Sequence, residues 1–195
     1  MKIILGSSSA GRKLIMDELS KEFGFVFEVM SPDIDEKSIR HDNPSDLVMA
    51  IANAKADALV SKIKEPAILI CSDQVVLYDN QIREKPVNEN EAREFLQSYS
   101  NINPEMIGAI VVVNTENGKR AGAIQVSKIH FKPLPAEIIT RHINSGLALS
   151  GSGGFSIHDP ILEDYIDYVE GGFDSATGLS KELVKKLVAE VDGIF

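Results

Sequence analysis

Cysteine is almost missing from this chain of 195 residues, in which Cys71 stands alone. One cysteine cannot form an internal disulfide, and none of the four histidines is spaced around it as a zinc ligand would be. The sequence therefore excludes a disulfide-stabilised scaffold and a zinc finger.

Long hydrophobic runs are missing as well. The apolar stretches 68–71 and 110–113 are far shorter than the roughly 20 residues that cross a bilayer. The apolar start of the chain is followed at once by Gly6 and three serines, so it does not extend into the hydrophobic segment of a signal peptide. We therefore expect a cytoplasmic protein without a membrane partner.

Positive charge is in deficit, because 20 Lys and Arg oppose 29 Asp and Glu, which gives a net charge of −9. This balance disfavours binding to a nucleic-acid backbone, whose affinity depends on Lys and Arg at the phosphates. A small anionic ligand stays open if the few cations converge. The remaining composition, 44% hydrophobic with 14 glycines, is typical of a globular protein and not of a disordered or collagen-like one. The oligomeric state stays open, a homodimer included.

The hydrophobic pattern predicts alternating strands and helices. In the first half we expect strands over 2–5, 25–30 and 67–72, a hairpin through Asp79-Asn80, and helices from Ser9, over 45–63 and over 88–99. In the second half we expect strands over 107–114 and 121–131, joined by an Asn117-Gly118 turn, and helices over 135–144 and 180–191. This order favours an α/β or α+β fold, with a mixed sheet, flanking helices and two lobes around a cleft.

The segment 6–13 connects the first predicted strand to the first predicted helix. Unpaired backbone N–H groups and the positive end of a helix dipole make such a connection favourable for an anion, above all phosphate. Its serine hydroxyls add donors, and Arg12 can reach back over the loop. The alternative is that Ser9 only caps the helix and that Arg12 is solvated.

The same segment nearly fits a Walker A motif, because four residues separate Gly6 from Gly11 and the strand 67–73 ends in an acid as a Walker B strand does. The match fails where the chemistry is concentrated. Arg12 replaces the lysine that reaches the phosphates, and Lys13 replaces the hydroxyl that holds Mg²⁺. The P-loop interpretation is therefore the weaker rival.

Carboxylates mark two further places. Asp73 closes a predicted buried strand, at the kind of position where sites are built, and residues 33–36 form an acidic segment. Carboxylate oxygens suit Mg²⁺ or Mn²⁺, which usually takes one or two of them and completes its shell with substrate phosphates and water. For residues 33–36 a solvated acidic loop is an equal alternative.

Two lysines stand out by their surroundings. Lys55 shares the apolar stripe of a predicted helix with Ile51 and Leu59, so its side chain points toward the core or a cleft. A snorkelling lysine gives the same pattern. Lys85 follows the predicted hairpin and precedes a rigid proline, although alone this segment is only a loop.

Taken together and in order, these motifs resemble the signature of the Maf family, nucleoside triphosphate pyrophosphatases also called septum-formation-inhibitor-like proteins. The series consists of residues 4–13, 35–36, 55–56, 72–76 and 84–86. Toward the C-terminus, residues 152–158 are similar to the family's Ala-Gly-x-Tyr-x-Ile-Gln loop, and residues 177–179 to its closing Gly-Leu-Pro. The resemblance covers essentially the whole chain, which makes residues 1–195 one domain of this family.

The resemblance implies an α/β fold similar to inosine triphosphate pyrophosphatases, and hydrolysis of a nucleotide between its α- and β-phosphates to a monophosphate and pyrophosphate. It assigns neutralisation of the triphosphate to a set of donors, Ser7, Ser9, Arg12, Lys55 and Lys85. Glu36 and Asp73 would hold Mg²⁺ or Mn²⁺ or orient water, with Asp73 as the better proton acceptor.

Three positions depart from the family pattern and resemble its specificity positions. Gly11 replaces the first arginine of Ser-Pro-Arg-Arg, Gln74 replaces the threonine after the aspartate, and His158 replaces the loop glutamine. We expect Gln74 and His158 to bind the base, with Phe155 as an aromatic face for a cationic ring. Residues 72–75 resemble the branch that acts on 7-methyl-GTP. A dTTP/UTP pyrophosphatase of the same family and a nucleotide-binding protein with weak or no turnover are the alternatives.

Overall fold

The computed structural model describes residues 1–193, so the last two residues of the predicted domain, 194–195, lie outside the described residues. The chain divides into two compact units. Unit 1 comprises Met1–Asp73, Gly108–Gln125 and the residues from Gly178 onward, and unit 2 comprises Gln74–Ile107 and Val126–Thr177. The boundary thus falls between Asp73 and Gln74, two of the predicted site residues.

The strands form one mixed sheet. Within residues 1–193 they are β1 (Lys2–Gly6), β2 (Phe27–Val29), β3 (Ala67–Tyr78), β4 (Gln81–Arg83), β5 (Glu105–Asn114), β6 (Arg120–Phe131) and β7 (Ile166–Glu170). Their order is β2-β1-β3-β5-β6-β7, with β4 paired to β3. β1 is parallel to β2 and β3, whereas β3 with β4 and β6 with β7 are antiparallel. The predicted mixed sheet is confirmed.

The α-helices of the described residues are α1 (Ala10–Phe23), α2 (Pro44–Val60), α3 (Glu89–Ser98), α4 (Ala136–Asn144), α5 (Phe173–Thr177) and α6 (Lys181–Glu190). Polar side chains begin four of them, because Ser9, Asn43, Asn88 and Ser180 each accept a hydrogen bond from a first-turn N–H group. Five helices lie where the sequence predicts them. Among the α-helices and strands of the described residues, only α5 and β7 are not predicted from the sequence.

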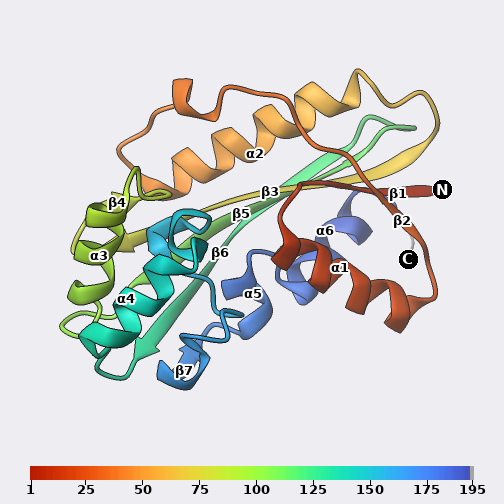
Figure 1. Cartoon of the computed structure of the whole chain (residues 1–195). Helices are drawn as coiled ribbons and strands as arrows, with labels where there is room; N and C mark the ends of the chain where they lie inside the picture. The colour runs from red at the N-terminus through yellow and green to blue at the C-terminus, as the bar shows by residue number, and fades with distance from the viewer. Residues whose placement is uncertain (194–195) are drawn as a thin grey trace. The chain divides into compact units, whose positions relative to one another are not determined.

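In unit 1 both faces of the strands are covered. α1 and α6 pack on one face, where Ile3, Leu5, Ile68 and Ile70 are buried among their side chains. α2 lies on the other side of β1 and β3 (Figure 1). A Cβ atom at Gly6 would lie 2.4 Å from Cys71 Sγ and 2.8 Å from Leu59 Cδ1, so β1 ends on a glycine where α2 and β3 approach it closely.

The core of unit 2 is built around aromatic rings. The Tyr99 ring stacks on Phe131 at 5.6 Å between centroids and meets Phe155 edge-on at 5.4 Å. The Tyr99 hydroxyl donates to Gly153 O at 2.7 Å, which fixes the glycine-rich segment Ser152–Gly154 to the residue that follows α3. His142 Nε2 lies 2.8 Å from Gly154 O and holds the same segment to α4.

Two predicted boundaries are wrong. β3 does not end at Ser72 but continues to Tyr78, so Asp73 lies inside a strand and not at its end. The strand can continue because a lysine of α2 compensates the aspartate charge. The connection between β5 and β6 is a loop over 115–119 and not a two-residue turn, with Gly118 at a φ of 73°. Among the described residues, no helix is long and apolar enough to span a bilayer.

Candidate functional site

The serine-rich loop of unit 1 is organised by hydrogen bonds to its own side chains. Ser9 caps α1 by accepting from Arg12 N at 3.4 Å, and Ser7 Oγ accepts from Ser9 N at 3.2 Å. Ser7 Oγ therefore uses its lone pairs within the loop, while its own O–H remains a donor. Lys13 instead pairs with Asp17 on the surface at 3.0 Å, so the Walker A position of the magnesium hydroxyl is occupied by a solvated lysine.

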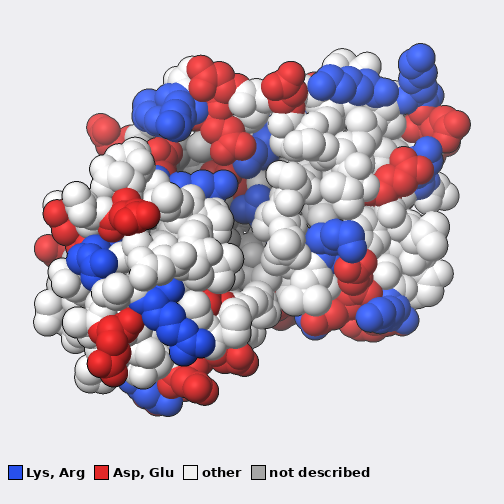
Figure 2. Space-filling model, viewed as in Figure 1, with Lys and Arg blue, Asp and Glu red and all other residues white. Residues whose placement is uncertain are grey.

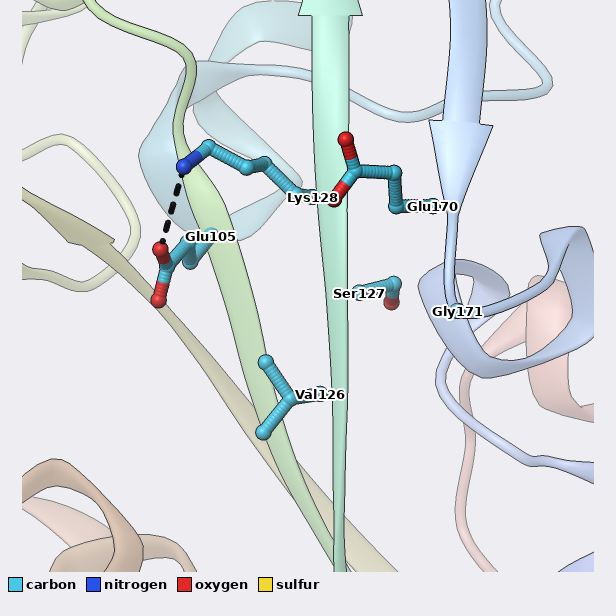
Figure 3. A pocket seen from close by; sticks show the side chains of 6 residues that line it. All are labelled: Glu105, Val126, Ser127, Lys128, Glu170 and Gly171. Atoms are coloured by element: carbon cyan, nitrogen blue, oxygen red, sulfur yellow. Dashed lines mark hydrogen bonds and ion pairs between the residues drawn. The ribbon is translucent and has the colours of Figure 1, made fainter.

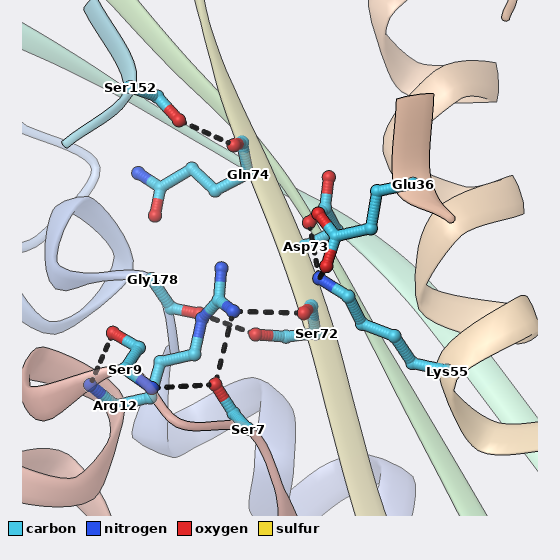
Figure 4. Close-up of polar contacts among 10 residues, drawn as sticks. All are labelled: Ser7, Ser9, Arg12, Glu36, Lys55, Ser72, Asp73, Gln74, Ser152 and Gly178. Atoms are coloured by element: carbon cyan, nitrogen blue, oxygen red, sulfur yellow. Dashed lines mark hydrogen bonds and ion pairs between the residues drawn. The ribbon is translucent and has the colours of Figure 1, made fainter. Parts of the chain in front are cut away.

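Arg12 is not solvated. Its Nη1 donates to Ser7 Oγ at 3.3 Å and to the backbone oxygen of Ser72 at 3.0 Å, so the guanidinium bridges α1 and β3 (Figure 4). Arg12 Nε is buried and has no hydrogen-bond partner among the described residues. An unsatisfied buried donor costs about 1–3 kcal/mol. The sequence-based alternative of a solvated Arg12 is therefore wrong.

Lys55 forms the centre of an ion-pair cluster in unit 1. Its Nζ lies 2.7 Å from Asp73 Oδ1 and 3.1 Å from Glu36 Oε1, and its side chain is only 6% exposed (Figure 4). The snorkelling interpretation is therefore wrong, because the ammonium itself is buried. Glu36, on the 3₁₀ turn Glu36–Ser38, is half-exposed, so the cluster opens toward solvent on the glutamate side.

Burial shifts the protonation equilibria of this cluster. Desolvation raises the pKa of Asp73, and the nearby charges of Lys55 and Arg12 oppose that shift. Desolvation also lowers the pKa of the Arg12 guanidinium. Burial raises the pKa of the Cys71 thiol to about 12, which leaves the only cysteine protonated at neutral pH and unsuited to act as a nucleophile.

The described residues contain no group of three or more His, Cys, Asp or Glu side chains that could hold a metal ion. Two carboxylates, Asp73 and Glu36, nevertheless share the Lys55 ammonium. Asp73 makes its contact with Lys55 through Oδ1. Such a pair matches the one or two protein carboxylates that Mg²⁺ needs when substrate phosphates complete its shell.

Three predicted residues belong to unit 2. Lys85 is exposed and has no acidic partner within residues 1–193. Gln74 Nε2 donates to Ala176 O at 3.1 Å, and its backbone oxygen accepts from Ser152 Oγ at 3.0 Å. His158 is exposed, with Nε2 2.8 Å from Thr177 Oγ1. The structure thus attaches both predicted base-binding residues to α5.

The expected role of Phe155 is wrong. Phe155 is 2% exposed and lies in the aromatic core of unit 2, where no nucleobase can reach its face. The exposed aromatic residue in this region is Phe173, the first residue of α5, at 52%. Sequence analysis missed it because α5 carries no hydrophobic periodicity; the Gly171-Gly172 pair before it was the available signal.

A shallow groove elsewhere in unit 2 contains none of the predicted site residues. It is lined by Glu105, Val126, Ser127, Lys128, Glu170 and Gly171 (Figure 3). Lys128 and Glu105 form an ion pair at 3.4 Å, and Glu170 is a second acid of the lining. On the face drawn in Figure 2, acidic and basic side chains are interspersed over the surface.

The chain matches one protein-family model and is similar to several known proteins. The model of the family described as Maf-like protein matches residues 2–191. The 7-methyl-GTP pyrophosphatase of Dictyostelium discoideum is 39% identical over 196 residues, which cover 97% of this chain and 96% of that protein. The dTTP/UTP pyrophosphatase of Vibrio vulnificus is 29% identical, with 91% and 92% covered. A solved nucleoside-triphosphatase (dITP/XTP pyrophosphatase) from Mycobacterium abscessus is 13% identical, with a TM-score of 0.46 and 98% and 95% covered.

Proposed function

Because the chain belongs to the Maf family, we infer that it is a nucleoside triphosphate pyrophosphatase, a hydrolase that cleaves between the α- and β-phosphates and releases pyrophosphate. The observation that carries this inference is the buried cluster of unit 1, in which Lys55 contacts Asp73 and Glu36. A buried acid can act as a general base, and a buried cation can neutralise developing phosphate charge, which are two contributions that hydrolysis of a phosphoanhydride uses.

Asp73 is the proton acceptor of the proposed reaction. Burial raises its pKa, and the ion pair with Lys55 opposes that rise by favouring the ionised carboxylate, the form that can act as a base. Oδ1 is held by Lys55, and Oδ2 is left to accept the proton of the attacking water. Lys55 therefore orients the base as well as contributing positive charge.

The triphosphate is bound by the donors of the serine-rich loop together with the lysines. Ser7, Ser9 and Arg12 supply hydroxyl and guanidinium donors at the start of α1, where the helix dipole also favours an anion. Arg12 is fixed by Ser7 and by the Ser72 carbonyl, so its orientation is set before the phosphate arrives. Lys55 and Lys85 complete the proposed neutralisation.

A divalent cation, Mg²⁺ or Mn²⁺, is part of the proposal. The hard oxygens of Asp73 and Glu36 fit it, and the contacts of both carboxylates with the Lys55 ammonium place them close together. When bound, the ion supplies charge neutralisation to the phosphate oxygens. Glu36 would keep it at the solvent-exposed side of the cluster.

The proposed substrate is 7-methyl-GTP, in the cytoplasm. The relative named for this substrate is 39% identical, against 29% for the dTTP/UTP enzyme of Vibrio vulnificus. Gln74 and His158 supply the polar groups for the base, and both are held by α5.

Product analysis tests the proposal. The purified protein is incubated with 7-methyl-GTP, GTP, dTTP or UTP, with Mg²⁺, with Mn²⁺ or with a chelator, and pyrophosphate and orthophosphate are quantified separately. We expect the monophosphate and pyrophosphate in equal amounts, only with metal, and fastest from 7-methyl-GTP. Orthophosphate as the first product would support the P-loop rival, and saturable binding without any product would make the protein a nucleotide-binding module.

A further inference from the structure

Phe173 is an exposed aromatic residue at a conformationally fixed position. Its two preceding residues, Gly171 and Gly172, have φ angles of 81° and 96°, which side-chain-bearing residues rarely adopt. A Cβ atom at Gly171 would lie 2.3 Å from the Val126 carbonyl oxygen, so that residue must be glycine. The two glycines thus fix the backbone of the turn between β7 and α5. In this conformation Phe173 is 52% exposed.

The imidazole of His158 lies beside Phe173 in a defined tautomer. The two ring centroids are 6.5 Å apart, and His158 Nε2 is 2.8 Å from Thr177 Oγ1. The Thr177 hydroxyl donates its only proton to the Phe173 carbonyl at 2.7 Å. His158 Nε2 must therefore carry the hydrogen in this contact, which leaves Nδ1 of the neutral ring as an acceptor without a partner among the described residues.

Gln74 offers a second acceptor near the same helix. Its Nε2 donates to Ala176 O at 3.1 Å, which defines the orientation of the amide. Oε1 takes no part in that contact and is left as an acceptor. α5 therefore carries an exposed aromatic face and holds two side chains that present acceptors.

These groups match one class of base. Guanine presents two neighbouring donors, N1–H and its exocyclic amine, whereas uracil and thymine present one N–H between two carbonyls. A pyrimidine would leave one acceptor unsatisfied and fail to cover the aromatic face. Methylation at N7 makes the guanine ring cationic, and a cation is attracted to the face of an aromatic ring.

We propose that Phe173 is a specificity-determining residue that stacks on a cationic guanine base, while His158 Nδ1 and Gln74 Oε1 accept from its N1–H and amine. The proposal rests on the proposed function, because it assigns the base preference of the same reaction. In this proposal the exposed Phe173, which a base can reach, takes the role that the sequence analysis gives to the buried Phe155.

The test compares 7-methyl-GTP with GTP, two substrates that share every hydrogen-bonding group named above. In Phe173→Leu we expect the ratio of kcat/KM for 7-methyl-GTP over GTP to fall about 3- to 30-fold, the range of a cation–π contact. Phe173→Tyr should restore the ratio. The matched control is Tyr168→Leu, because Tyr168 is 49% exposed on β7 but stacks on His130. That variant should leave the ratio unchanged.

Equilibrium titration of both nucleotides without metal gives a readout that does not depend on turnover. The affinity ratio should fall in Phe173→Leu as the kinetic ratio does. An unchanged ratio in Phe173→Leu, or an equal loss in Tyr168→Leu, would overturn the role of Phe173 while pyrophosphate release by the unmutated protein upholds the proposed function. An unmutated protein that binds but does not cleave would reject the proposed function, and the affinity ratios would then decide the role of Phe173.

Discussion

Lys55 and Asp73 of unit 1 are buried side chains joined by opposite charges, whereas His158 and Phe173 of unit 2 are exposed side chains held by neutral hydrogen bonds and a glycine turn. Two charges interact strongly in a buried site, and removal of one leaves the other as an uncompensated buried charge, which destabilises the protein. Exposed groups can be changed at little cost in stability. We therefore expect substitutions of the buried hydrolytic residues to cost stability, whereas substitutions of the exposed residues can change base preference alone.

The largest expected effect follows from Asp73→Asn. An asparagine keeps an oxygen for Lys55 but can neither accept a proton nor carry the charge that a metal needs. We expect turnover to fall about 100-fold or more on every nucleotide of the panel. Steady-state kinetics measure this, and full turnover in the variant would remove Asp73 from the mechanism.

A double variant separates catalysis from stability. In Asp73→Asn the buried Lys55 ammonium keeps only the half-exposed Glu36 as an ionised partner, so the thermal midpoint should fall. Removing the cation as well, in Lys55→Met/Asp73→Asn, should recover part of that midpoint while turnover stays low. If the double variant regained turnover together with stability, the defect of the single variant would be structural.

The sequence predicted most elements because capping residues and apolar periodicity are local signals. Ser9 and Asn88 begin their helices as expected, and the Asp79-Asn80 hairpin forms with both residues at positive φ. Asp73 was misplaced at a strand end because its compensating lysine is 18 residues away in the sequence. Local patterns show that a residue is charged but do not show what neutralises it.

The site was predicted unevenly for the same reason. Motif order singles out Lys55, Asp73 and Glu36, and the structure brings these three side chains into contact. Exposure, however, depends on tertiary packing, so sequence could not distinguish the buried Phe155 from the exposed Phe173. Whether Lys85 contacts the triphosphate remains a prediction.

The pH dependence of kcat/KM tests the role of Asp73 in unit 1. Only ionised Asp73 is active, and burial raises its pKa, so activity should begin to fall on acidification above 3.8, the ordinary value of the group. Lys55→Met removes a cation that lowers this pKa, so the acid limb of kcat/KM should move to higher pH. Below the limb, activity falls about tenfold per pH unit. A limb that stays in place or moves to lower pH would exclude Asp73 as the titrating group.

A smaller effect is expected from Gln74→Thr in unit 2. The variant loses the acceptor that faces the base, and one hydrogen bond contributes about 0.5–1.5 kcal/mol. The preference for 7-methyl-GTP over dTTP should narrow or reverse, by about 2- to 10-fold, with the thermal midpoint unchanged. Competition assays with both nucleotides measure the ratio directly; a uniform loss on both would assign Gln74 to the scaffold.

The central claim is that hydrolysis and base preference depend on separate residues. Its most direct test is to measure kcat/KM for 7-methyl-GTP and for UTP, at the pH optimum, in two variants. Lys55→Met should lower both values by the same factor, so that their ratio stays within about threefold of the unmutated protein, because charge on the triphosphate is independent of the base. His158→Ala should change the ratio while UTP hydrolysis changes little. The opposite result, a changed ratio in Lys55→Met and an equal loss on both substrates in His158→Ala, would contradict the account.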